Sequence, residues 1–252
     1  MEGLYNKALL NFGQKILKIL REHSRFLITE PICAHLLLKE NGRKNLRINR
    51  KNKRFIYLIS PTNIKNINFY NKLNQVLSSK KVSFFQLRLK KENRKKKIII
   101  ANKIRKICKK YQVKFLVNDD PMLAKKINAD GCHLGQKDMN ILKARKILKN
   151  KIIGITCHNS IKLAKKAITA GANYLAFGAF YSTRTKKVKY KANLKILRLV
   201  KKLTNAPVVA IGGIKNTNYK KLLLNKANFL AISGYIWNNK KLSPKKAMDK
   251  II

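Results

Sequence analysis

The stretch FLVNDDPMLAKKINADGCHLGQKDM, residues 115–139, contains two short apolar runs with a helix-like segment between them. The first run ends at the polar pair Asn118 and Asp119, and the second ends shortly before Asp138. Short runs that are apolar on both faces are typical of strands in a parallel sheet covered by helices. The stretch therefore predicts a strand, a helix and a second strand, with polar side chains after each strand.

The same pattern recurs from residue 55 onward. Eight apolar runs follow one another: FIYLIS (55–60), VSFFQLR (82–88), VKFLVND (113–119), GCHLG (131–135), IIGITCH (152–158), NYLAFGAF (173–180), PVVAIGG (207–213) and FLAISGY (229–235). Segments with helical apolar spacing separate them, for example Ile98, Ala101, Ile104 and Cys108. Eight strand–helix units in about 200 residues predict an α/β fold, a (βα)8 TIM barrel, with its catalytic loops at the rim where the strands end.

Residues 1–53 are predicted to be a separate N-terminal basic helical extension and linker, and residues 54–252 the barrel domain. Leu9, Phe12, Ile16, Ile19 and Leu20 form an apolar stripe at helical spacing, and the basic run ENGRKNLRINRKNKR (40–54) follows. The helix could pack on the barrel or on a partner, or attach to a membrane surface. The sequence leaves these alternatives open.

The chain is strongly basic, with 59 Lys and Arg against 10 Asp and Glu and a formal net charge of +49. The basic residues are spread along the whole chain without a separate tail or a nucleic-acid-binding motif, which predicts no specific nucleic-acid partner. The charge would still attract small phosphorylated anions. No apolar run is long enough to span a membrane, the N-terminus does not resemble a secretory signal, and four cysteines without CxxC pairing predict buried thiols in a cytoplasmic protein.

Acidic residues are concentrated in residues 119–138, where four of the ten occur. Asp119 and Asp138 follow neighbouring predicted strands, so their carboxylates can converge on one Mg²⁺, which takes one or two protein carboxylates together with water and phosphate oxygens. Asp120 precedes Pro121 as a helix cap, and Asp130 lies before a strand at the opposite end of the barrel. The alternative is that these acids are loop caps and surface charges.

Two kinds of anion-binding group are also predicted at the rim. Gly212, Gly213, Ser233 and Gly234 follow the last two strands, where many TIM barrels bind phosphate, although the glycines could serve only as a tight turn. Further hydroxyl groups and cations follow other strands: Thr183, Thr185 and Lys186 after the sixth, and Arg88 and Lys90 after the second. One metal ion with two anion-binding groups suggests a diphosphate and a second phosphate.

The sequence from about residue 55 to residue 237 resembles the thiamine phosphate synthase family. The resemblance is carried by QLRLK (86–90), VNDDPMLA (117–124), ADGCHLGQKD (129–138), GITCHN (154–159), STRTK (182–186), PVVAIGGI (207–214) and AIS (231–233). The ND and ADGxHLGQxD segments are the most diagnostic of these motifs, whereas AIGGI occurs widely in phosphate-binding barrels.

This resemblance implies the condensation of hydroxymethylpyrimidine diphosphate with thiazole phosphate, which releases pyrophosphate. It assigns contacts with the pyrimidine diphosphate to Gln86, Arg88, Lys90, Asn118, Thr156 and Lys186. It assigns Mg²⁺ to Asp119 and Asp138, and the thiazole phosphate to Thr183, Thr185, Gly213, Ile232 and Ser233. A homo-oligomer is compatible with these expectations.

Four positions depart from the family pattern. Leu89 stands where an acid is common, Ser182 and Arg184 stand in place of proline and a smaller or acidic residue, and Thr156 replaces a usual serine. Two other functions stay open at this point: a thiazole tautomerase on the same fold, which typically lacks the full set of diphosphate ligands, and a basic nucleic-acid-binding or regulatory protein.

Overall fold

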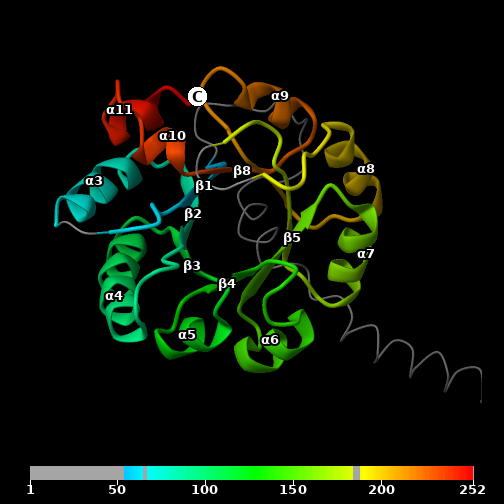
Figure 1. Cartoon of the computed structure of the whole chain (residues 1–252), viewed down its shortest axis with the longest axis horizontal. Coiled ribbons are helices and arrows are strands. Elements are labelled where there is room, and N and C mark those ends of the chain that lie inside the picture. The colour runs from blue at the N-terminus through cyan, green and yellow to red at the C-terminus, as the bar shows by residue number, and fades with distance from the viewer. Residues whose placement is uncertain (1–53, 65–66, 184–187, 252) are drawn as a thin grey trace, which may run out of the picture. The chain divides into compact units, whose positions relative to one another are not determined.

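The computed structural model describes residues 54–64, 67–183 and 188–251. In this part of the chain eight parallel strands form a closed barrel in chain order, which confirms the predicted fold (Figure 1). The strands are β1 (Ile56–Ile59), β2 (Val82–Leu87), β3 (Lys114–Asn118), β4 (Gly131–Leu134), β5 (Ile152–His158), β6 (Tyr174–Phe177), β7 (Val208–Ile211) and β8 (Phe229–Ile232). The predicted extension, residues 1–53, lies outside the described residues.

The helices lie on the outside of the strands (Figure 1). They are α3 (Asn68–Leu77), α4 (Arg94–Lys110), α5 (Pro121–Lys126), α6 (Ile141–Leu148), α7 (Ile161–Thr169), α8 (Lys195–Leu203), α9 (Tyr219–Leu224), α10 (Gly234–Trp237) and α11 (Pro244–Asp249). Side-chain caps define several of their starts. The Asp120 side chain accepts a hydrogen bond of 2.8 Å from the Leu123 amide, and Pro121 opens α5, so the predicted cap is confirmed.

Alternate residues of each strand face opposite sides of the barrel wall. Outward-facing side chains such as Phe85, Leu87, Phe115 and Val117 join the hydrophobic core between strands and helices. Inward-facing aromatic rings fill the barrel: Tyr57 of β1 contacts Tyr174 of β6, a strand that is not its neighbour, with ring centroids 5.7 Å apart. Since the interior is packed with side chains, ligands can reach the barrel only at its ends.

The end of the barrel where the strands begin is closed by structural polar contacts. The Asp130 carboxylate accepts hydrogen bonds from the Phe115 amide at 2.8 Å and from the Lys114 Nζ at 3.2 Å. Arg145 of α6 donates to three carbonyl oxygens and to one side-chain amide from the neighbouring loops. Asp130 therefore lies away from the acids at the rim, as predicted.

Three of the cysteines, Cys108, Cys132 and Cys157, are buried as free thiols, and burial raises the pKa of each well above its usual range. They behave as small apolar side chains, in agreement with the prediction, whereas Cys33 lies outside the described residues. Within the described residues, none of the helices combines the length and the apolar character needed to cross a membrane.

Candidate active site

Asp119 and Asp138 meet above the ends of β3 and β4. Asp119 follows β3 with φ at +64°, and its amide donates a 2.8 Å hydrogen bond to the carbonyl oxygen of His133 on β4. Asp138 lies in the loop after β4, where its Oδ2 accepts a 2.7 Å hydrogen bond from the Gly135 amide. With these main-chain contacts the two carboxyl groups lie close enough for Asp138 to raise the pKa of Asp119.

The negative charges of Asp119 and Asp138 repel each other when no cation lies between them. Burial, and then the hydrogen bond and repulsion from Asp138, raise the pKa of Asp119 to about 6. Lys90 opposes this shift, with its Nζ 3.5 Å from Asp119 Oδ2. Because the lysine side chain is half exposed, it compensates only part of the negative charge. A cation at this position would stabilise both carboxylates.

The oxygen ligands available here fit Mg²⁺ that is shared with a phosphate group. The described residues contain no cluster of three or more His, Cys, Asp or Glu side chains that could enclose a metal ion by themselves. Two adjacent carboxylates are nevertheless the usual protein contribution to Mg²⁺ when phosphate oxygens and water complete its coordination. The residues therefore fit a metal ion that is held jointly with a substrate.

Gln86, Arg88 and Lys90 lie on or after β2 at alternate positions. Gln86 is only 2% exposed, and within the described residues its side-chain Nε2 has no hydrogen-bond partner. Such a buried donor without a partner is costly, and a ligand acceptor would relieve the cost. The Arg88 amide is fixed by a 2.9 Å hydrogen bond to Ser60 Oγ, which orients the end of β2.

Asn118 and Thr156 occupy the ends of two further strands near the acids. Asn118 pairs with His133 in the β3–β4 register. Thr156 lies on β5, with its hydroxyl 2.8 Å from His133 Nε2 and its carbonyl oxygen 2.5 Å from the amide nitrogen of Gln136. Both polar groups of Thr156 are thus held by neighbouring side chains.

The predicted phosphate-binding glycines of the β7 loop, Gly212 and Gly213, pack closely against the β6 loop. Gly213 has φ at +62°, and a Cβ added there would lie 2.3 Å from the Ser182 carbonyl oxygen, so a side chain would push the two loops apart. Thr183 follows in the same β6 loop. Ser233 begins α10, and its hydroxyl donates to the Ser60 carbonyl oxygen at 3.2 Å.

Three predicted site residues stand apart from the others. The side chain of Ile232 is 2% exposed and belongs to the core between strands and helices, so it faces away from the barrel interior and leaves only its main chain for ligand contact. Thr185 and Lys186 lie outside the described residues, as does Arg184. The structure therefore places Lys90 beside Asp119 and both Asn118 and Thr156 beside His133, whereas Gly213 lies against the β6 loop and Ser233 against Ser60.

The model of the thiamine monophosphate synthase family matches residues 56–236. This chain belongs to that family. It is 70% identical over 206 residues to the thiamine-phosphate synthase of Pelagibacter ubique, a match that covers 82% of this chain and 100% of that protein. The thiamine-phosphate synthase of Nitrosomonas eutropha is 38% identical over 179 residues, which are 71% of this chain and 84% of that protein.

A solved structure of thiamine phosphate pyrophosphorylase from Pyrococcus furiosus superimposes with a TM-score of 0.70 and 27% sequence identity. The match covers 79% of this chain and 94% of that chain. Sequence and fold comparisons therefore agree on the thiamine monophosphate synthase family, and the range matched by the family model contains all eight strands.

The departures from the thiamine monophosphate synthase pattern that the structure describes are accommodated by packing. Leu89 is 6% exposed and belongs to the hydrophobic core, so an apolar side chain is suited to that position. Ser182 is exposed, and its carbonyl oxygen is the atom closest to Gly213. Neither residue is one of the predicted site residues.

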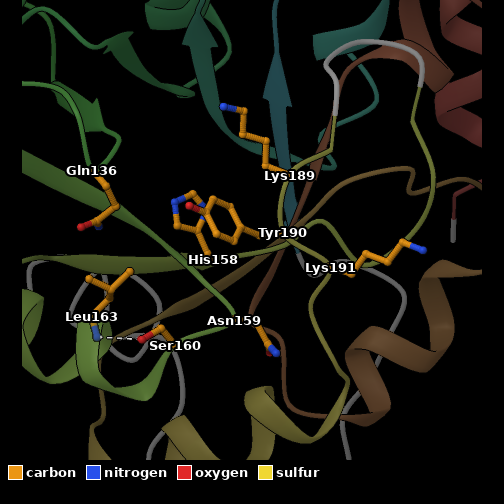
Figure 2. Close-up of a pocket in the computed structure, with 8 residues that line it drawn as sticks. All are labelled: Gln136, His158, Asn159, Ser160, Leu163, Lys189, Tyr190 and Lys191. Atoms are coloured by element: carbon orange, nitrogen blue, oxygen red, sulfur yellow. Dashed lines mark hydrogen bonds between the residues drawn. The ribbon is translucent and has the colours of Figure 1, made fainter.

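A pocket of about 500 Å³ has neither Asp119 nor Asp138 among its lining residues (Figure 2). Its walls come from the end of β5, from the start of α7 and from the loops after β4, β5 and β6: Gln136, His158, Asn159, Ser160, Leu163, Lys189, Tyr190 and Lys191. The His158 and Tyr190 rings pack with centroids 4.2 Å apart, and Figure 2 shows Lys189 and Lys191 directed away from them. The pocket alone would not have identified the acid pair, since it touches this site only through Gln136.

The sequence pattern indicated no specific role for the interior polar residues His133, Tyr174 and Tyr57. In the structure, His133 Nδ1 lies 2.8 Å from the Tyr174 hydroxyl, which lies 2.7 Å from the Tyr57 hydroxyl. Burial lowers the pKa of His133 to about 4, so its ring is neutral at physiological pH. The alternation of residues along β1, β4 and β6 could have predicted that these side chains face inward, but not that they contact one another.

Proposed function

We propose that the rim of this barrel condenses hydroxymethylpyrimidine diphosphate with thiazole phosphate to give thiamine phosphate and pyrophosphate, with Mg²⁺ bound by Asp119 and Asp138. The observation that carries the proposal is the convergence of these two carboxyl groups beside Lys90 in a member of the thiamine monophosphate synthase family. A tautomerase acting on a thiazole phosphate has no diphosphate to bind and no need for this arrangement.

The diphosphate would lie above β2, β3 and β4. Arg88, Lys90, Asn118 and Lys186 would supply the cations and the amide that contact its oxygens, and Mg²⁺ held by Asp119 and Asp138 would supply further positive charge beside the leaving group. Lys90 Nζ lies 3.5 Å from Asp119 Oδ2, and at this position its positive charge would stabilise the departing pyrophosphate. The family pattern, rather than geometry, supports the role of Lys186.

The pyrimidine ring would bind deeper in the barrel mouth, against Gln86 and Thr156. The unpaired Nε2 donor of Gln86 supports this placement, because a ring nitrogen is the kind of acceptor that it lacks. Thr156 offers a hydroxyl group whose position is fixed by its neighbours. Together these groups would orient the methylene carbon toward the second substrate.

The thiazole phosphate would bind at the β6, β7 and β8 loops. Thr183 and Thr185 would donate hydroxyl groups, and Gly213, Ile232 and Ser233 would donate main-chain N–H groups. The absence of a Cβ at Gly213 allows close approach of the backbone to the phosphate, and the positive φ there is consistent with such a turn.

In the reaction, the carbon–oxygen bond between the pyrimidine methylene group and the diphosphate breaks, and pyrophosphate leaves with the electron pair. The lone pair of the thiazole nitrogen then forms the new carbon–nitrogen bond. The protein contributes no nucleophile. Its residues hold the two substrates in line, and the cations around the diphosphate stabilise the leaving group.

The direct test is to incubate the purified protein with both phosphorylated precursors and Mg²⁺ and to measure thiamine phosphate and pyrophosphate. We expect both products in equal amounts, and their loss when EDTA replaces Mg²⁺. Conversion of the thiazole precursor alone, without coupling and without Mg²⁺, would instead indicate a tautomerase. Absence of product above a heat-treated control would contradict the proposal.

A further inference from the structure

A chain of hydrogen bonds crosses the barrel interior and ends at Thr156. It runs from the Tyr57 hydroxyl to the Tyr174 hydroxyl over 2.7 Å, then to His133 Nδ1 over 2.8 Å, and from His133 Nε2 to Thr156 Oγ1 over 2.8 Å. Its members come from β1, β6, β4 and β5. Both ring nitrogens of His133 are therefore engaged, one toward the interior and one toward the rim.

Packing fixes the middle of this chain. A Cβ added to Gly154 would lie 1.8 Å from an atom of the Tyr174 ring, so the ring occupies the space that a side chain at residue 154 would need. The Tyr174 ring also stacks on His133, with centroids 5.6 Å apart and an interplanar angle of 18°. His133 Nδ1 is thus held by the Tyr174 hydroxyl, and the Tyr174 ring lies nearly parallel to the imidazole.

The other end of the chain determines how Thr156 is presented. The side-chain Nε2 of Gln136 donates a 2.5 Å hydrogen bond to the Thr156 carbonyl oxygen, and His133 Nε2 bonds to the Thr156 hydroxyl. A threonine hydroxyl has one donor and two acceptor positions, and one of these is taken by His133. The positions that remain are available to a ligand in a fixed direction, which reduces the entropy lost when the ligand binds.

We infer that His133 is a positioning residue for the pyrimidine substrate: it orients the Thr156 hydroxyl, and Tyr174 and Tyr57 hold it in place. The inference rests on the proposed function, in which Thr156 contacts the pyrimidine diphosphate. His133 is not required to touch the substrate or to transfer a proton. A merely structural histidine would alter stability without selectively weakening the binding of one of the two substrates.

Two amide substitutions of His133 distinguish the role of Nε2 from that of Nδ1. The Gln side chain can place its amide near the position of Nε2 and so reach Thr156, whereas the shorter Asn side chain places its amide near Nδ1, facing Tyr174. We expect His133→Gln to keep the KM for the pyrimidine diphosphate within about 3-fold of wild type, and His133→Asn to raise it about 10-fold. The KM for thiazole phosphate should change less than about 2-fold in both variants.

A double-mutant comparison tests whether the effect passes through Thr156. In a Thr156→Val background, which removes the hydroxyl but keeps the branched shape, His133→Gln and His133→Asn should have the same KM for the pyrimidine diphosphate. The inference is overturned if Gln and Asn behave alike in the wild-type background, or if their difference persists with Val. It is also overturned if Thr156→Val alone has wild-type kinetics.

If the His133 variants do not fold, as judged by circular dichroism, Tyr174→Phe provides the decisive variant because it keeps the ring and removes only the hydroxyl. An increase of about 3-fold in the KM for the pyrimidine diphosphate would support the inference, and an unchanged value would overturn it. The wild-type assay distinguishes failure of the proposed function from failure of the inference about His133. Wild type without thiamine phosphate formation contradicts the proposed function itself, whereas an active wild type with indistinguishable variants contradicts only the role of His133.

Discussion

The carboxyl groups of Asp119 and Asp138 interact electrostatically, and Asp138 raises the pKa of Asp119, although the two residues belong to loops after two different strands. The contact depends on the main chain as much as on the side chains, because the Asp119 amide bonds to the His133 carbonyl oxygen and the Asp138 carboxylate to the Gly135 amide. The loops after β3 and β4 therefore form one acidic site at the rim of a strongly basic protein.

Removing either charge should abolish the response to Mg²⁺. We expect Asp138→Asn to lower kcat/KM about 100-fold, because the remaining carboxylate holds the metal ion poorly, while its amide oxygen can still accept the Gly135 hydrogen bond. The melting temperature of wild type should rise with Mg²⁺ and pyrophosphate, and that of the variant should not.

Asp120→Asn is the matched control for this substitution. It removes the neighbouring negative charge but can still cap α5, since Asn is as good an N-cap as Asp. It should retain the Mg²⁺ response and most of the activity. If Asp138→Asn were stabilised by Mg²⁺ and pyrophosphate as much as this control, the assigned metal site would be wrong.

The raised pKa of Asp119 predicts how stability depends on pH in EDTA. The unfolded side chain loses its proton near the ordinary aspartate pKa of 3.8, whereas the folded one retains it to about 6, so the folded state binds more protons between these values. Stability due to this group therefore falls as pH rises from about 4 to about 6. Asp119→Asn should melt at a higher temperature than wild type at pH 8, and the difference should shrink toward pH 4.

The lowered pKa of His133 acts in the opposite direction, since the unfolded ring takes up a proton below about 6.5 and the folded ring only near 4. This contribution is common to wild type and Asp119→Asn, so it cancels when their melting temperatures are compared. A constant difference between the two proteins from pH 4 to pH 8 would contradict the raised pKa of Asp119.

Gly213 is predicted to be required for binding of the thiazole phosphate. Gly213→Ala places a methyl group 2.3 Å from the Ser182 carbonyl oxygen at a positive φ, so we expect the KM for thiazole phosphate to rise about 10-fold or more. Gly171→Ala is the matched control, because Gly171 also has a positive φ but open space around the added methyl group. It should cost about 1 kcal/mol of stability and leave both KM values unchanged. Equal kinetic effects of the two substitutions would contradict the assigned site.

Arg145 is predicted to affect stability without affecting the chemistry. Its guanidinium donates to the carbonyl oxygens of Lys149, Lys151 and Gly171 at 2.6 to 2.8 Å and to the Asn173 side chain at 2.7 Å. Arg145→Met would remove these four hydrogen bonds, and we expect a loss of about 2–4 kcal/mol in the free energy of unfolding, measured with urea. Lys143→Met, on an exposed position of the same helix, should change it by less than about 0.5 kcal/mol. At temperatures where both variants are folded, kcat and both KM values should match wild type.

The sequence predicted the strands closely because each one is a short apolar run that ends in polar residues. The run 113–119 contains β3, Lys114–Asn118, and the run 152–158 coincides with β5. The residue before Pro121 was predicted to cap a helix, and it does so because a side-chain carboxylate at that position satisfies an amide that the helix cannot. These features depend on neighbours along the chain, so they can be predicted from local sequence.

The interior of the barrel could not be predicted in the same way. Family resemblance assigned Ile232 to the site, yet its side chain points into the layer between strands and helices, and the hydrogen-bond chain from Tyr57 to Thr156 joins four strands. Which inward-facing side chains meet depends on how far the strands are staggered when the sheet closes, and the local sequence pattern does not specify this stagger.

By itself, the sequence determined the eight strand–helix units, the strand ends at which the predicted site residues occur and the family motifs, because apolar periodicity and strand-end polarity are properties of consecutive residues. The tertiary structure alone decided that Asp119 and Asp138 interact, that Gln86 has a buried donor without a partner among the described residues, and that His133 links the interior to Thr156. These relationships arise from barrel closure, which brings together side chains that are far apart along the chain and removes them from water. Charges and hydrogen bonds have larger energies in the protein interior than in water.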